Sequence, residues 1–285
     1  MSSVPRLAKA LFAAALALPT VLADSDGPVV PNYEVHLQLD PTVVLNSDYR
    51  LNDDVIAEFG MPSTVTKKNV QYIDTLDKAL SDQGWSCRIR SIEDEDDFDL
   101  TYKWRLPIVN GDIDAAIEIA FADGWNDGQG NYKSQVDWYL ESQELSISRD
   151  YSAASSGYSG MDDPDEKDSR KMLIDNAPKM FDNWVASGWG TDELAEGVIY
   201  GPVLSKASEG TWNGVELDIE IWPIQNAAGT GIDYLVEASF KTDDYAFAAE
   251  ARTELQALLT SKGWFLNASQ SKQALVLANY HPSSS

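Results

Sequence analysis

A period-two alternation of apolar and polar residues recurs along this chain and limits its fold more than any other feature. In residues 33–40, apolar Val35, Leu37 and Leu39 are separated by polar residues. Because neighbouring side chains of a strand point to opposite sides of a sheet, this segment is predicted to be a strand with one polar face. The same pattern occurs in residues 86–94, 99–108, 214–224 and 233–241.

The other segments add further strands and several helices. Residues 65–75 predict a strand, and residues 133–151 indicate one long strand or a bent pair. Residues 112–121 are a further strand or a helix, and their alternating end with β-branched residues favours the strand. About eight strands, close enough in sequence to form hairpins, predict an α+β fold with helices packed outside an antiparallel sheet. An eight-stranded β-barrel is the expected form of that sheet, and a strongly curved open sheet is the alternative. Helices are predicted at residues 52–59, 76–84, 169–187 and 243–262, and a surface insertion at residues 152–169.

The N-terminus has the pattern of a cleavable signal peptide over residues 1–23. Arg6 and Lys9 precede a short apolar run, and small residues follow up to Ala23. That run is shorter than the roughly 20 residues of a membrane span, so we expect a secreted, extracellular protein with no membrane association after cleavage. A buried N-terminal helix is the alternative. We further expect a linker at 24–32, a domain at 33–270, a tail at 271–285, and N-glycosylation at Asn267 in an Asn-Ala-Ser sequon.

Composition excludes some classes of partner. The formal net charge is −25, and it becomes about −27 when the two basic residues of the signal peptide are removed. Such a charge argues against binding to nucleic acid or anionic membranes, because both require clustered Lys and Arg. Cys87 is the single cysteine, so no intramolecular disulfide can form, and a buried thiol is favoured over a reactive one. The nine tryptophans are interpreted as core residues rather than a sugar-binding platform.

Charges are segregated by strand on the polar faces. Basic pairs occur on two neighbouring strands, as Arg88 with Arg90 and as Lys103 with Arg105, whereas other strands concentrate carboxylates. A polar sheet face exposed to water is one explanation. In a closed barrel, the same faces would line a tunnel where Arg and Lys hold phosphate oxygens and carboxylates hold Mg²⁺ or Mn²⁺. The acidic strands carry Glu34, Glu216, Asp218, Glu220 and Glu237.

Several of these segments resemble the CYTH superfamily, also called triphosphate tunnel metalloenzymes. Residues 71–105 contain a Tyr-x-Asp-Thr turn, a helix-turn with Leu and Gly, an Arg-x-Arg strand and a Lys strand, as that family does. EVHLQLD stands where the family has its Glu-x-Glu-x-Lys signature, and GVELDIEIW and DYLVEASFK resemble its C-terminal acidic strands. The resemblance covers residues 33–264. It implies an eight-stranded barrel around a tunnel that hydrolyses a triphosphate with a divalent metal.

Transferred to this chain, the resemblance implies specific roles. Arg88, Arg90, Lys103 and Arg105 would bind the substrate phosphates. Glu34, Glu216, Asp218, Glu220 and Glu237 would bind Mg²⁺ or Mn²⁺, and Glu34, His36 and Glu220 would act in catalysis.

The chain departs from the signature at two positions, His36 and Gln38. An imidazole at position 36 is compatible with a Mn²⁺ or Zn²⁺ ligand, a general base, a pH-sensitive cation or a structural residue. Two functions therefore remain open. One is metal-dependent hydrolysis of tripolyphosphate or a nucleoside triphosphate; the other is an inactive barrel that binds a small anionic or organic ligand or a protein partner.

Overall fold

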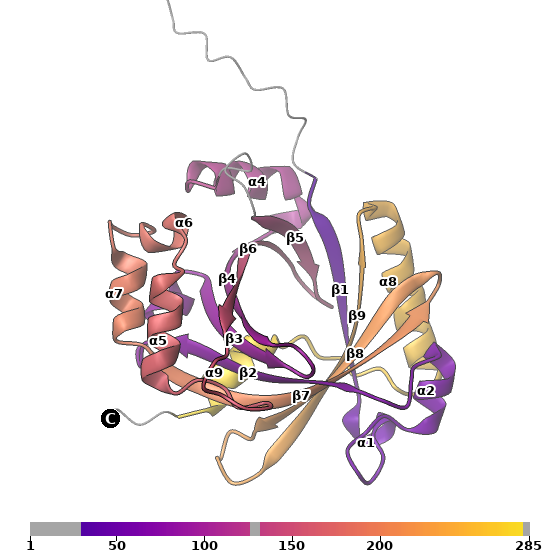
Figure 1. Ribbon diagram of the computed structural model, residues 1–285. Coiled ribbons are helices and arrows are strands. Elements are labelled where there is room, and N and C mark those ends of the chain that lie inside the picture. Colours follow the sequence, from indigo (N-terminus) through magenta and orange to yellow (C-terminus); the bar gives the residue numbers. More distant parts are fainter. Residues whose placement is uncertain (1–29, 126–131, 282–285) are drawn as a thin grey trace, which may run out of the picture.

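The computed structural model describes residues 30–125 and 132–281, and within these ranges nine strands form one closed barrel (Figure 1). The predicted signal peptide and most of the predicted linker, residues 24–29, lie outside the described residues. The strands are β1 (Asn32–Leu39), β2 (Thr66–Asp74), β3 (Trp85–Ile92), β4 (Asp97–Pro107), β5 (Lys133–Trp138), β6 (Gln143–Ala154), β7 (Val198–Trp212), β8 (Val215–Gln225) and β9 (Ile232–Thr242).

The strand order around the barrel is β1-β5-β6-β4-β3-β2-β7-β8-β9. Every neighbouring pair is antiparallel except β1 and β5, which run parallel. The prediction of eight antiparallel strands is therefore wrong in number and in pairing. The reason is parity: strand directions cannot alternate all the way around a closed ring with an odd number of members, so one pair must be parallel.

Residues 112–121, for which a strand was favoured over a helix, form most of helix α4 (Ile113–Ala122). Asp112 caps its N-terminus by accepting a hydrogen bond from the Ala115 backbone N–H at 3.0 Å. The buried residues of α4 are Ala116, Ile117 and Ala120, whose spacing matches one helix face. The β-branched residues that favoured a strand are thus accommodated by a capped helix.

Two other strand assignments are refined by the structure. The segment 133–151 is a bent pair, as one of the two alternatives predicted, because β5 and β6 are separate antiparallel strands. Strand β7 was not predicted at all. Its apolar positions are interrupted by Gly201 and Pro202 and by several small polar residues, so the period-two signal is weak there.

Helices surround the barrel. The helix predicted at 243–262 is α8, which packs against β1 and β9, and the one predicted at 169–187 is broken before Pro178, which disfavours a helical conformation at Ala177. The predicted helix at 52–59 is confirmed, with an Asn52 N-cap and a left-handed Gly60 C-cap. The helices not yet bounded are α1 (Pro41–Val44), α2 (Asp53–Phe59), α3 (Ala79–Asp82), α5 (Glu166–Asp175), α6 (Lys179–Asp182), α7 (Trp189–Ala195), α8 (Tyr245–Ser261) and α9 (Lys272–Asn279), with a 3₁₀ turn at Val109–Gly111.

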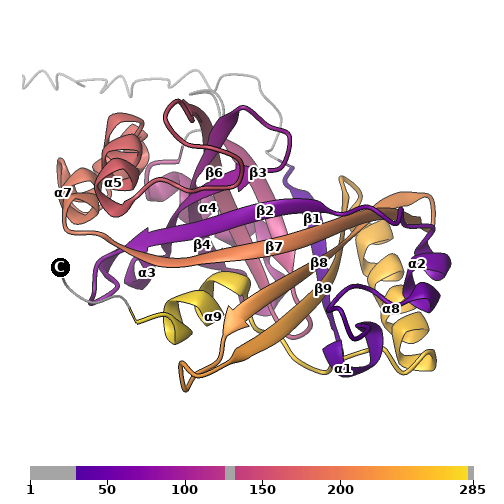
Figure 2. The same ribbon diagram turned by 60° about the horizontal axis from the view of Figure 1, so that its bottom comes forward.

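Helix α9 lies in the segment 271–285, which was predicted to be a tail. It packs against β2, β7 and β8 (Figure 2). Val276 and Leu277 are buried there, in a cluster with Tyr72 and Trp222. The end of the chain is therefore part of the barrel's packing.

The apolar core lies largely between the barrel and its helices, whereas the barrel interior is polar. Cys87 is buried, as predicted, and burial raises the pKa of its thiol well above the usual value. The tryptophans are buried or pack against the two core clusters, which confirms the core interpretation. No helix in the described ranges combines the length and the apolarity needed to cross a membrane.

Candidate functional site

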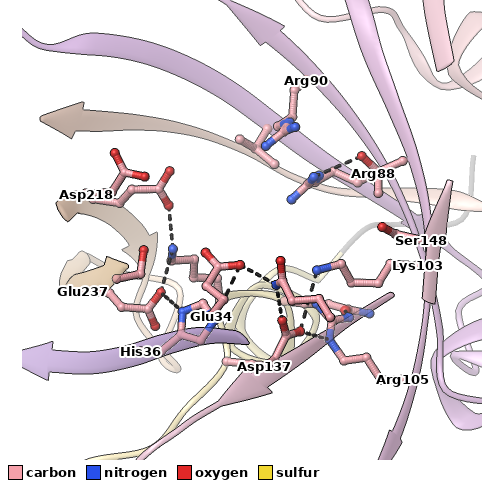
Figure 3. A pocket seen from close by; sticks show the side chains of 18 of the residues that line it. Glu34, His36, Arg88, Arg90, Lys103, Arg105, Asp137, Ser148, Asp218 and Glu237 are labelled. Atoms are coloured by element: carbon pink, nitrogen blue, oxygen red, sulfur yellow. Dashed lines mark hydrogen bonds and ion pairs between the residues drawn. The ribbon is translucent and has the colours of Figure 1, made fainter. Parts of the chain in front are cut away.

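A cavity of about 290 Å³ occupies the barrel interior, lined mainly by charged and polar side chains (Figure 3). Period two explains the convergence, because alternate residues of every strand point inward. Glu216 is the one predicted metal, phosphate or catalytic residue that does not line the cavity, since it is exposed and groups with Glu209 and Asp218. The predicted residues that line the cavity are Glu34, His36, Arg88, Arg90, Lys103, Arg105, Asp218, Glu220 and Glu237.

Arg88 is the least compensated cation of the cavity. Its guanidinium donates to the Thr101 hydroxyl at 3.0 Å, and among the described residues its Nε is buried without a hydrogen-bond partner. No carboxylate of the described chain lies within ion-pair distance of Arg88, whereas neighbouring Arg90 is paired with Asp99. Burial and the charge of Arg90 lower the pKa of Arg88. The arrangement leaves a half-buried positive charge facing the cavity.

Lys103 and Arg105 share one buried carboxylate, Asp137 of β5. The Lys103 ammonium and the Arg105 Nε each lie 3.6 Å from Asp137 Oδ2. Burial alone would raise the pKa of Asp137, but Lys103 and Arg105 more than offset it and bring the pKa to about 2. Burial also lowers the pKa of Lys103, and Asp137 only partly opposes that effect. The pair contacts are loose, so both cations retain capacity for a further anion.

His36 lies between two carboxylates. Its Nδ1 is 3.0 Å from Glu237 Oε1, its Nε2 is 3.9 Å from Glu34 Oε2, and its ring stacks on Tyr139 at a centroid distance of 4.9 Å. Burial lowers the pKa of His36, but the Glu237 and Glu34 carboxylates outweigh it, so the pKa is raised. Nε2 is buried and has no hydrogen-bond partner in the described chain. The contacts with Glu237 and Tyr139 thus fix the orientation of the ring, while Nε2 makes no hydrogen bond within the described chain.

The acidic wall is already paired with lysines. Lys272 Nζ lies 2.5 Å from Glu220 Oε2 and 2.8 Å from Glu237 Oε1, and Lys68 Nζ lies 2.9 Å from Glu220 Oε1. Burial would raise the pKa of both carboxylates, but the lysines and His36 lower it, to about 2 in Glu237. Both lysines were missed in the sequence analysis.

The sequence contains a pattern that could have identified Asp137, a cavity residue that was not predicted. Gln135, Asp137 and Tyr139 alternate with apolar Val136 and Trp138, so the same period-two rule places Asp137 on an inward face. For Lys272, a serine N-cap precedes a short helix with apolar residues. Nothing local indicates that this helix reaches the barrel interior.

One group of side chains has the donors for a divalent metal. Ligand atoms of Glu34, His36 and Asp137 all lie within 4.8 Å of one another, and the unpartnered His36 Nε2 belongs to this group. The Gln135 amide donates to both Glu34 and Asp137, so a positively polarised group already lies between the two carboxylates. A mixed nitrogen and oxygen donor set suits Mn²⁺ or Zn²⁺. The Glu220 and Glu237 carboxylates fit a metal poorly, because lysine ammonium groups hold them.

The cavity has a different charge from the chain as a whole. In the described part of the chain, eight Lys or Arg residues and six Asp or Glu residues line it, although the formal net charge of the chain is −25. An interior with a surplus of cations is electrostatically suited to an anion.

No protein-family model and no curated protein sequence matches this chain. Among solved structures, the chain is similar to HpAC1 of Hippeastrum, a proposed adenylyl cyclase described as having a dominant triphosphatase activity. The TM-score is 0.52 and the identity 16%, over 85% of this chain and 93% of that chain. A proposed adenylate cyclase of Bacillus halodurans gives a TM-score of 0.46 at 12% identity, over 86% of this chain and 96% of that chain. By its closed barrel and by the HpAC1 likeness, the chain has the fold of the CYTH superfamily.

Proposed function

We propose that the chain binds a polyphosphate, such as tripolyphosphate or the triphosphate of a nucleotide, inside its barrel. The half-buried Arg88 guanidinium carries the proposal, because its buried Nε has no partner in the described residues. A buried, unpaired charge is costly unless a ligand compensates it, and phosphate oxygens accept from guanidinium in bidentate geometry. The triphosphatase activity named for HpAC1 supports this class of ligand.

We further propose that the bound polyphosphate is hydrolysed with the help of a divalent metal, of which Mn²⁺ best suits the mixed nitrogen and oxygen donors present. The residues suited to hold it are Glu34, His36 and Asp137. Such a metal would neutralise charge on the phosphoryl group that is transferred. The protein's own contribution is electrostatic: Arg88, together with the basic pair of β4, holds phosphate oxygens and keeps the scissile bond in place.

Glu220, which was predicted to act in catalysis, is not given a catalytic role in the proposed hydrolysis. A general base must be free to accept a proton, and Glu220 already accepts hydrogen bonds from Lys68 and Lys272. A water-orienting role therefore fits Glu34 better. It is 16% exposed and lies beside the unpartnered His36 nitrogen.

A second candidate is binding without hydrolysis. One observation favours it: the Lys272 ammonium lies between Glu220 and Glu237, where a metal ligand set had been predicted. Direct measurement separates the two candidates. Release of phosphate from tripolyphosphate with Mg²⁺ or Mn²⁺ supports hydrolysis, and saturable binding without release supports the binding protein.

The decisive variant is Arg88→Ala. We expect tripolyphosphate binding, measured by titration calorimetry, to weaken at least tenfold, because a buried charge-assisted hydrogen bond is lost. Arg88→Lys should recover only part of the affinity, since it keeps the charge without the fork geometry. Arg50→Ala, which removes an exposed arginine away from the cavity, is the matched control. Unchanged binding by Arg88→Ala would reject the site.

We also propose that the chain is exported and acts outside the cell. The basis is the pattern of residues 1–23 described above, and Asn267 is exposed between α8 and α9, accessible to a glycosyltransferase. Intact-mass analysis of protein from the medium of a eukaryotic host should give a mature N-terminus at Asp24. Retention of Met1 or absence from the medium would refute export.

A further inference from the structure

Two carboxylates face each other on the acidic wall. Glu220 of β8 and Glu237 of β9 are directly opposite in the antiparallel register, and their side chains are only 15% and 3% exposed. Like charges directly opposite on a sheet destabilise it, and burial increases the cost. This pair therefore requires a cation.

The required positive charge comes from lysines. Lys272 bridges the pair through contacts of 2.5 and 2.8 Å, and Lys68 contacts Glu220 from the other side. The two negative charges thus face two positive charges before His36 is counted. A divalent cation added to this group would leave a buried excess of two positive charges.

Lys272 is held in place by the fold. The Gln38 side chain donates to the Gln270 carbonyl at 2.7 Å, and Arg105 donates to the Gln273 side chain at 2.8 Å. At the far end of α9, Asn279 donates to the Gln225 carbonyl at 2.7 Å. A cation in the first turn of a helix is disfavoured by the helix dipole. The position of Lys272 is therefore set by these anchors and by the two carboxylates.

We propose that Lys272 is a built-in cation of the ligand site, which occupies the place of a divalent metal between Glu220 and Glu237. The deduction about the ligand rests on the proposed polyphosphate binding. Glu220 and Glu237 use two of the three ammonium N–H donors. For the third donor, the described residues offer only a weak cation–π contact with the Trp222 ring, whose centroid lies 5.5 Å from Nζ. That donor is left for a phosphate oxygen, so this wall binds the ligand without metal.

The anchor of Lys272 also accounts for a departure from the expected signature. Gln38 stands where the resemblance places a lysine, and its amide holds the backbone next to Lys272. The cation missing from β1 is thus supplied by the C-terminal segment, which β1 positions.

Metal stoichiometry tests the inference directly. The full-length mature protein and Lys272→Met are titrated with Mn²⁺ and followed by electron paramagnetic resonance. We expect the variant to bind one Mn²⁺ more than the wild type, because the carboxylate pair loses its internal cation. Lys272→Met combined with Glu220→Gln should return to the wild-type number. Lys272→Arg, which keeps the charge, should not gain a site.

Lys262→Met is the matched control, since Lys262 pairs with Glu58 outside the cavity, and it should bind as the wild type does. Thermal melts confirm that each variant is folded. Two results would overturn the inference. One is that Lys272→Met binds the same number of Mn²⁺ ions as the wild type. The other is that the single variant Glu220→Gln binds fewer Mn²⁺ ions than the wild type.

Ligand binding provides the second readout. In EDTA, tripolyphosphate should bind the wild type and bind Lys272→Met at least tenfold more weakly, with recovery when Mn²⁺ is added. Equal affinity of both proteins in EDTA would overturn the role of Lys272 in ligand binding. If neither protein binds tripolyphosphate under any condition but the variant gains Mn²⁺, the built-in cation stands and the proposed function fails.

Discussion

Asp163 shows how burial changes a single side chain outside the cavity. It lies in the segment between β6 and α5, where both carboxylate oxygens are buried and the Ser91 backbone N–H is the donor that acts on them. Burial raises its pKa to about 7, against a lowering influence of the Ser91 backbone N–H. The residue is therefore largely neutral in the folded protein below neutral pH.

The sign of the resulting pH dependence follows from linkage. The unfolded carboxyl has a pKa of about 3.9, so between about pH 4 and 7 the folded state binds more protons than the unfolded state. Stability from this group therefore falls as the pH rises through that range. Asp163→Asn, which cannot ionise, should gain ~1–3 kcal/mol relative to wild type between pH 4 and pH 8.

Urea denaturation at pH 4, 6 and 8 measures the effect. Asp243→Asn, a change at an exposed carboxylate between β9 and α8, should show no such trend. A stability difference between Asp163→Asn and wild type that does not vary with pH would contradict the prediction.

For individual residues of the site, the side of the strand on which the side chain lies was largely predictable from the sequence. Arg88 and Arg90 lie two residues apart on a strand, so they point to the same side whatever the rest of the fold does. Glu216 obeys the same rule with Asp218 and still does not line the cavity, because it lies near the start of β8. Alternation gives the side of the sheet, not the depth in the barrel.

Elements were predicted with uneven success for physical reasons. Residues 112–121 contain alanine and isoleucine at spacings that satisfy either period, and the Asp112 cap and packing resolve the ambiguity as a helix. Strand β7 lacks a clean alternation, yet it has fifteen residues and pairs with both β2 and β8. Pairing with formed neighbours, rather than its own propensity, makes it a strand.

The contact between β7 and α2 yields an element-scale prediction. A Cβ added at Gly210 would lie 2.4 Å from the Phe59 carbonyl oxygen and 2.7 Å from Met61 Cγ. Because the first of these is backbone, the chain must shift to make room. Gly210→Ala should lower the free energy of unfolding by about 1–3 kcal/mol.

Equilibrium denaturation checks this expectation. Thr211→Ala changes the neighbouring, exposed residue of β7 and should stay within about 0.5 kcal/mol of wild type. Wild-type stability in Gly210→Ala would show that α2 is not held against β7 as described.

For the whole molecule, the main feature is the contrast between its surface and its interior. The chain carries a net charge of −25, while its cavity has a surplus of basic over acidic lining residues in the described ranges. A polyphosphate approaching from a distance meets the negative field first. Only within the barrel do Arg88 and its neighbours dominate.

This contrast predicts an unusual salt dependence. Screening shortens the Debye length from ~30 Å at 0.01 M to ~8 Å at 0.15 M ionic strength, which weakens the long-range repulsion. The association rate constant for tripolyphosphate should therefore rise severalfold over this range. Stopped-flow fluorescence can follow it, because Trp222 lines the cavity. A rate constant that falls with salt would mean that the positive interior controls the approach.

The sequence by itself determined which side chains share a face, since alternation is a local property of an extended backbone. That was enough to place nine of the cavity-lining residues on the polar faces of their strands. The closed barrel was expected from the resemblance to the CYTH superfamily, because a sheet face exposed to water explains the same alternation. Tertiary structure alone decided the parallel β1–β5 contact and the arrival of Lys272 between Glu220 and Glu237. Both depend on contacts between segments far apart in the chain, and no local pattern encodes such contacts.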